Sequence, residues 1–186
     1  ASDTSAGLMG NDTHINTLAT GDGVTVRDAA LASAPDLMDT TELSDAVLDG
    51  ASFATRTVKG LAVQATSIQQ IGALTAVAGG GAVGAAGAAI NVDQIGGSTR
   101  AYIDSAHWVN DYVVGVSADQ DVDVMAANHA MVASSVTALA IGAAGVSGAV
   151  GTEIIERSTR AEVIDGARVF SQDALSVKAV STNAVA

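Results

Sequence analysis

Residues 98–106 read Ser-Thr-Arg-Ala-Tyr-Ile-Asp-Ser-Ala, and residues 158–167 read Ser-Thr-Arg-Ala-Glu-Val-Ile-Asp-Gly-Ala. Each motif closes a segment that opens with a strand-like run and continues through a long stretch of Gly, Ala and Val. The two segments, 58–109 and 122–169, recur at an interval of about 60 residues. Repetition at such an interval is typical of quasi-linear folds in which each unit stacks on the next.

A shorter copy of the closing motif lies at residues 45–51. In all three copies an aliphatic residue precedes an aspartate, as in Leu48-Asp49, Ile103-Asp104 and Ile164-Asp165. Aspartate favours tight turns because its carboxylate binds backbone amides two residues further on. We therefore expect a short strand that ends in a turn at each place, and imperfect repeats of about 55–61 residues.

Two uncharged stretches could form either membrane-spanning helices or buried strands. Residues 60–92 contain no charged side chain, and residues 124–152 contain only His129 as an ionisable group. Their length would suffice for a helical membrane hairpin. However, each glycine costs a helix about 1 kcal/mol relative to alanine, and no aromatic belt or basic cluster flanks the stretches. A strand buried on both faces is also continuously apolar, so no membrane span is favoured.

We therefore predict an all-β fold, a parallel coil whose successive strands hydrogen-bond about 4.8 Å apart. Few Asn-Gly or Asp-Gly pairs mark tight antiparallel hairpins, and Gly and Ala would let neighbouring layers approach closely. Residues 1–50 form an acidic region that is either a partial repeat or a cap. Residues 51–110 form one repeat, and residues 111–186 form a second repeat with the start of the next.

The acidic region carries weaker signals. Gly21-Asp22-Gly23 predicts a turn, and Val24-Thr25-Val26 predicts a short strand. Residues 29–43 are rich in Ala and Leu and predict a helix that Pro35 interrupts.

The charge and reactive residues exclude several functions. The net charge is −12, and residues 1–50 hold nine acids but one base, which disfavours nucleic acid and anionic membranes as partners. The absence of cysteine excludes disulfides and thiolate metal sites. The three histidines, His14, His107 and His129, lack zinc-site spacing, and no nucleophile has an evident base. We therefore expect no enzyme and no catalytic residue.

One carboxylate cluster predicts a weak Ca²⁺ site, formed by Asp119, Asp121 and Asp123. On a strand, alternate carboxylates share a face and repel one another unless a cation lies among them. An EF-hand loop would need Gly and Glu where this chain has Val124 and Ala130. The alternative is a solvated acidic turn.

The residues 73–92 with 99–106, and 136–155 with 159–167, resemble the repeats of large filamentous-haemagglutinin-like and leukotoxin-like surface adhesins of bacteria. The resemblance covers about residues 56–186 and is weaker over the acidic region. It implies a right-handed parallel β-helix, secretion, a location at the bacterial cell surface and adhesion. It supplies no catalytic residue.

The resulting prediction is a stiff extracellular segment that binds a protein or glycan on a cell surface and associates end to end. Val177-Lys178-Ala179-Val180 starts another strand-like run, so we expect a fragment or processed product of a longer protein. One alternative is a filament subunit whose strand completes the sheet of the next chain. A second alternative is a membrane-inserting helical hairpin built from the two uncharged stretches.

Overall fold

The computed structural model describes residues 2–8, 13–15, 22–33, 51–104, 107–110 and 118–185. The all-β prediction is confirmed, because these residues form eleven strands and no helix. In chain order the strands are β1 (Ser2–Leu8), β2 (Thr13–Ile15), β3 (Val24–Ser33), β4 (Ser52–Val58), β5 (Gly60–Gly80), β6 (Ala85–Ile103), β7 (His107–Val109), β8 (Asp121–Ile141), β9 (Gly145–Val163), β10 (Arg168–Val169) and β11 (Leu175–Val185).

Strands that lie far apart in sequence pair in parallel. Each residue of β5 lies opposite a residue of β8, and each residue of β6 lies opposite a residue of β9. With β11 and β1 added, the two long sheets have the strand orders β11-β8-β5 and β1-β6-β9. A third, small sheet has the order β10-β7-β2. The two closing motifs lie side by side, with residues 98–103 opposite residues 158–163.

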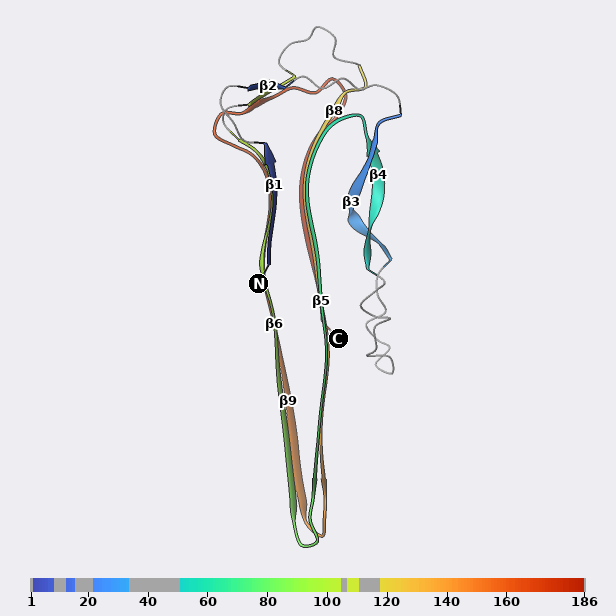
Figure 1. The fold of residues 1–186 in the computed structure, drawn as a ribbon, viewed down its shortest axis with the longest axis vertical. Coiled ribbons are helices and arrows are strands. Elements are labelled where there is room, and N and C mark those ends of the chain that lie inside the picture. The colour runs from blue at the N-terminus through green and yellow to red at the C-terminus, as the bar shows by residue number, and fades with distance from the viewer. Residues whose placement is uncertain are drawn as a thin grey trace.

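The two long sheets form two layers that face each other. Figure 1 shows the layers converging from the end near β2 toward a tip made by the turns at 81–84 and 142–144. We call residues 60–71, 93–103, 107–109, 121–132 and 153–163 the broad half. We call residues 72–92 and 133–152 the tip half.

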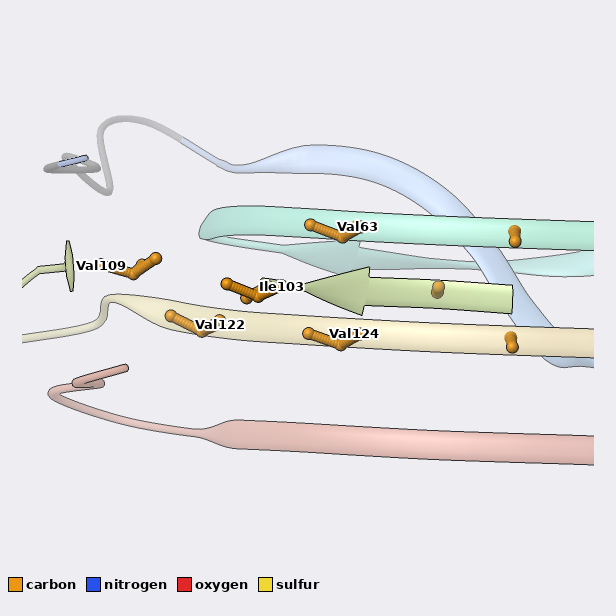
Figure 2. Close-up of a cluster of buried hydrophobic side chains, with 8 residues drawn as sticks. Val63, Ile103, Val109, Val122 and Val124 are labelled. Carbon is orange, nitrogen blue, oxygen red and sulfur yellow. The ribbon is translucent and has the colours of Figure 1, made fainter. Parts of the chain in front are cut away.

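The broad half contains the hydrophobic core. Valine and isoleucine side chains from both layers meet between them, and Val63, Ile103, Val109, Val122 and Val124 are shown in Figure 2. A second cluster, Ile95, Ala130 and Val132, lies closer to the tip. Burying a side chain of this size is worth about 1.5–3 kcal/mol, so this half supplies most of the hydrophobic stabilisation.

The tip half has small residues between its layers. A Cβ atom added to Gly79 would overlap the carbonyl oxygen of Ala86, and one added to Gly87 would lie 2.8 Å from the carbonyl oxygen of Leu139. The layers therefore approach as closely as the Gly/Ala composition predicts. The expectation that these strands are buried on both faces is wrong here, because Leu74 and Ile90 alternate with the small residues and are exposed on the outside.

An antiparallel pair, β3 and β4, covers the outer face of β8 in the broad half. Ala29 packs against Met125 and Ala127, and Phe53 meets His129 edge-on with ring centroids 5.3 Å apart. This cover explains why β8 is buried on both faces from residue 122 to residue 132.

The predicted strand over residues 24–26 is confirmed as part of β3. The predicted helix over residues 29–43 is wrong for residues 29–33, which belong to the same strand; residues 34–43 lie outside the described residues. Pairing with β4 and packing on β8 outweigh the local helix preference of an Ala-rich run.

The N-terminal residues, which show weak periodicity in the sequence, contain a further strand. β1 pairs with β6 so that Thr4 lies opposite Thr99 and Ala6 lies opposite Ala101. The copy of the closing motif that the sequence places at 45–51 falls, except for Ala51, outside the described residues.

In the described part of the chain, no helix has the length and apolar character needed to cross a membrane. The uncharged stretches form the strands β5, β6, β8 and β9. The structure thus has no helical hairpin over these stretches, and membrane insertion stays a prediction.

Candidate functional site

The three aspartates predicted to bind Ca²⁺ lie at the start of β8, and each contacts a different group. Asp119 lies in the preceding turn, 3.5 Å from the ammonium group of Lys59. Asp121 accepts hydrogen bonds from the backbone amides of Lys59 and Ala174, both at 3.2 Å. Asp121 thus joins the segments that precede β5 and β11.

Asp123 lies two residues further along β8 and contacts β4. Its buried carboxylate is 2.5 Å from the Arg56 guanidinium and accepts a hydrogen bond from Gln64 at 3.2 Å. Among the described residues no three His, Asp or Glu side chains are grouped so that they could hold a metal ion. The Ca²⁺ site stays a prediction, and the contacts of these carboxylates are structural.

A polar layer crosses the interior of the broad half at Arg157 of β9. Its guanidinium donates hydrogen bonds to Gln69 at 2.7 Å, Asn128 at 2.9 Å and Ser67 at 3.1 Å. It also donates to the carbonyl oxygen of Gly96 at 3.1 Å. The residue opposite Arg157 in the sheet is Gly97, which leaves room for the guanidinium between the layers.

The outer face of the same sheet carries a row of serine and arginine side chains. Ser98 and Arg100 of β6 lie opposite Ser158 and Arg160 of β9. These residues, with Thr99, line an open hollow that we call the Ser-x-Arg face: Ser98, Thr99, Arg100, Ser158 and Arg160. None of these five residues is a carboxylate, but the Asp3 carboxylate adjoins the hollow through its hydrogen bond with Ser98.

Glu162 lies beside the Ser-x-Arg face and contacts both arginines. Arg100 donates two hydrogen bonds to one carboxylate oxygen of Glu162, at 2.9 and 3.2 Å. Arg160 lies 3.7 Å from the other oxygen, which is beyond hydrogen-bond distance. The two arginines therefore share one carboxylate, and Arg160 keeps most of its donors toward solvent, with 68% of its side chain exposed.

Aromatic rings support the arginines at two places. Arg100 lies over the Tyr102 ring, 4.3 Å from its centroid, and a Cβ added to Gly7 of β1 would overlap that ring. Arg168 lies 4.2 Å over the Trp108 ring. Since Arg100 is stacked as well as hydrogen-bonded, its guanidinium is held in place on the outer face.

Asp3 of β1 continues the row on the other side of β6. It accepts hydrogen bonds from the Ser98 hydroxyl at 2.9 Å and the Ser98 backbone amide at 2.8 Å. These two bonds hold the pKa of Asp3 below its ordinary value. Burial lowers the pKa of Arg157, and the nearby charge of Asp3 opposes that shift.

The sequence identified the Ser-Thr-Arg-Ala motif but predicted only a strand and a turn from it. The paired arginines on one outer face follow from the parallel register, which sequence reasoning did not use to place them together. The interior position of Arg157 was also missed, although its place one residue before Ser158 in the motif, where the first copy has Gly97, was an available signal.

The chain was compared with known proteins in three ways. No protein-family model, no curated protein and no solved structure matches it.

Proposed function

We propose that this chain is a stiff segment of a secreted bacterial surface adhesin, folded as a right-handed parallel β-helix. The observation that carries the proposal is the unbroken parallel pairing of β5 with β8 and of β6 with β9. Each of these pairings joins residues about 60 positions apart. Because each long strand pairs with the strand about 60 residues further along the chain, additional repeats can add strands to the same sheets in the same way.

The stiffness follows from the number of hydrogen bonds that bending would have to disturb. Pairing extends along the whole of the long strands, and the layers of the tip half are in close contact at Gly79 and Gly87. Such a segment holds its outer faces at a fixed distance from the cell, where polar rows such as the Ser-x-Arg face can contact a protein or glycan.

Two measurements on the bacterium and on the isolated chain test this role. Antibodies against the chain are expected to label intact, unpermeabilised bacteria, and beads coated with the chain are expected to bind cultured cells. Labelling only after permeabilisation, or bead binding no greater than with albumin-coated beads, would overturn the proposal.

A second candidate function is a self-assembling extracellular filament. It is favoured by the sheet edges: within the described residues, β9 and β5 each have a hydrogen-bonded neighbour on one side only. Exposed strand edges are templates for pairing with another chain. Static light scattering tests this candidate: a filament subunit gains mass steeply with concentration, and a mass that stays constant would contradict it.

A further inference from the structure

We propose that the Ser-x-Arg face binds an acidic sugar, whose carboxylate lies between the guanidinium groups of Arg100 and Arg160. This inference deepens the adhesive role proposed above and rests on it for the presence of such sugars at a cell surface. The starting observation is chemical: a hollow lined by two arginines and two outward-facing serines occurs in a chain of net charge −12, whereas the Thr99 hydroxyl faces the interior at Arg157.

The register of the sheet places the two arginines next to each other. Arg100 and Arg160 lie opposite each other on neighbouring parallel strands, which are about 4.8 Å apart. Like charges at directly opposite positions destabilise a sheet unless an opposite charge offsets them. Glu162 offsets only part of this repulsion, because it is hydrogen-bonded to Arg100 and 3.7 Å from Arg160. A further anion at the exposed side of Arg160 would offset the rest of the repulsion between the two guanidinium groups.

The contact with Glu162 also identifies the kind of anion that fits. A carboxylate already bridges the two guanidinium groups from one side of the hollow. Guanidinium groups bind carboxylates through parallel N–H donors with planar, directional geometry. A ligand carboxylate can therefore approach from the open side in the same way, using the donors of Arg160 that Glu162 does not reach.

The hydroxyl residues point to a sugar as the carrier of that carboxylate. Ser98 and Ser158 flank the arginines on adjacent strands, and both line the hollow. The Ser98 hydroxyl donates its hydrogen to Asp3 and can still accept, while the Ser158 hydroxyl can both donate and accept; this matches the ring hydroxyls of a sugar. The hollow is open, and its lining contains no large apolar side chain, so it does not favour the apolar residues of a peptide.

The binding test uses a short oligogalacturonate as the probe and the neutral oligogalactan of equal length as its control. Nuclear magnetic resonance titration of the whole chain should shift the side-chain Nε–H signals of Arg100 and Arg160 with oligogalacturonate. It should leave them unchanged with the neutral sugar. Equal shifts with both sugars, or no shift with either, would overturn the proposal.

Three variants assign the binding to this face. Arg160→Gln should weaken oligogalacturonate binding at least about tenfold, because a charge-assisted hydrogen-bonded contact is lost. Glu162→Gln should strengthen binding severalfold, because it removes the competing carboxylate. Lys178→Gln removes one exposed positive charge from β11, away from the hollow, and should have no effect. Equal weakening by Lys178→Gln would show unspecific attraction and overturn the assignment.

Two further experiments, a peptide competitor and the bead assay, separate this inference from its alternatives. A tri-glutamate peptide that binds as tightly as oligogalacturonate would overturn the sugar in favour of any carboxylate. If beads coated with Arg160→Gln bind cells as well as the unmodified chain does, the sugar site fails while adhesion stands. If oligogalacturonate binding needs Arg160 but the beads bind no cells, the adhesive role fails and the site stands. A urea midpoint like that of the unmodified chain establishes that Arg160→Gln is folded.

Discussion

The broad half and the tip half share the same strands and the same register, yet their interiors are opposite in character. In the broad half, valine and isoleucine fill the space between the layers, and polar groups from both layers meet at Arg157. In the tip half, mostly glycine and alanine lie between the layers, together with Val136, and large aliphatic side chains such as Leu74 and Ile90 lie outside. Parallel pairing alone therefore does not decide which side of a strand is the core.

The two halves obtain their stability in different ways. The broad half depends on burying large side chains, so deletion of a methyl group there leaves a cavity. The tip half depends on backbone hydrogen bonds and close layer contact, so addition of a methyl group there creates overlap. The two halves should respond in opposite ways to the same kind of substitution.

The largest expected effect comes from two isoleucines on the same strand, β6. Ile103 is 0% exposed in the broad half, and Ile90 is 72% exposed in the tip half. Ile103→Ala should lower the free energy of unfolding by about 2–5 kcal/mol. Ile90→Ala should change it by at most about 0.5 kcal/mol. Urea denaturation followed by circular dichroism measures both, and equal effects would contradict the opposite interiors of the two halves.

The next effect concerns the polar layer of the broad half. Arg157→Ala removes the hydrogen-bond donor that serves Asn128, Gln69 and Ser67. Since an unsatisfied buried polar group costs about 1–3 kcal/mol, we expect a loss of about 2–3 kcal/mol.

Arg160→Ala is the matched control for Arg157→Ala. It removes an arginine of the same strand whose side chain lies outside and is 68% exposed. Its stability change should stay within about 0.5 kcal/mol. A loss from Arg160→Ala that equals the loss from Arg157→Ala would show that the interior position is not what matters.

The third effect reverses the sense of the substitution and tests the tip half. Gly79→Ala places a methyl group against the backbone of Ala86, whereas Gly148→Ala meets no atom within 4 Å. Overpacking of this kind costs about 1–3 kcal/mol. Gly148→Ala should be neutral or stabilising by up to about 1 kcal/mol, because alanine restricts the unfolded chain. Thermal unfolding of the two variants gives the comparison, and an unchanged Gly79→Ala would mean that the layers do not approach closely.

The sequence predicted the β class and the small residues between closely packed layers, because both follow from composition and repetition. It could not assign the outer face of the tip half. In a run such as Ala73-Leu74-Thr75-Ala76-Val77, the side chains alternate between small and large on both faces. A shift of one residue would exchange the inside and the outside.

The features that the sequence did not predict depend on pairing between residues that lie far apart in the chain. β1 matches the closing motif only at Thr4 and Ala6 when it is aligned with residues 98–103, and such a short match is not distinctive without the register. The helix predicted at residues 29–33 failed because its competitor, the pairing of β3 with β4, lies outside any local window. The Ser-x-Arg face required the same information, since its two halves lie about 60 residues apart.

The smallest expected effect lies at the edge of the broad half, where Asp3 attaches β1 to β6. The Ser98 hydroxyl and amide hold the pKa of Asp3 below its ordinary value of 3.8. A carboxylate with a lowered folded-state pKa stabilises the fold fully above its unfolded pKa, and this contribution is lost as the pH falls through the folded pKa. Asp3→Asn should therefore reduce stability slightly at pH 6 and have no effect well below pH 3.

Urea midpoints of the unmodified chain and of Asp3→Asn, measured from about pH 6 to about pH 2, should converge at the acidic end. Asp22→Asn, which removes an exposed carboxylate from the turn before β3, should leave the urea midpoint at about pH 6 unchanged. Parallel curves for Asp3→Asn and the unmodified chain would show that the Ser98 contacts do not stabilise β1. The tip half has no contact comparable to that between Asp3 and Ser98, because residues 72–92 and 133–152 contain no ionisable side chain.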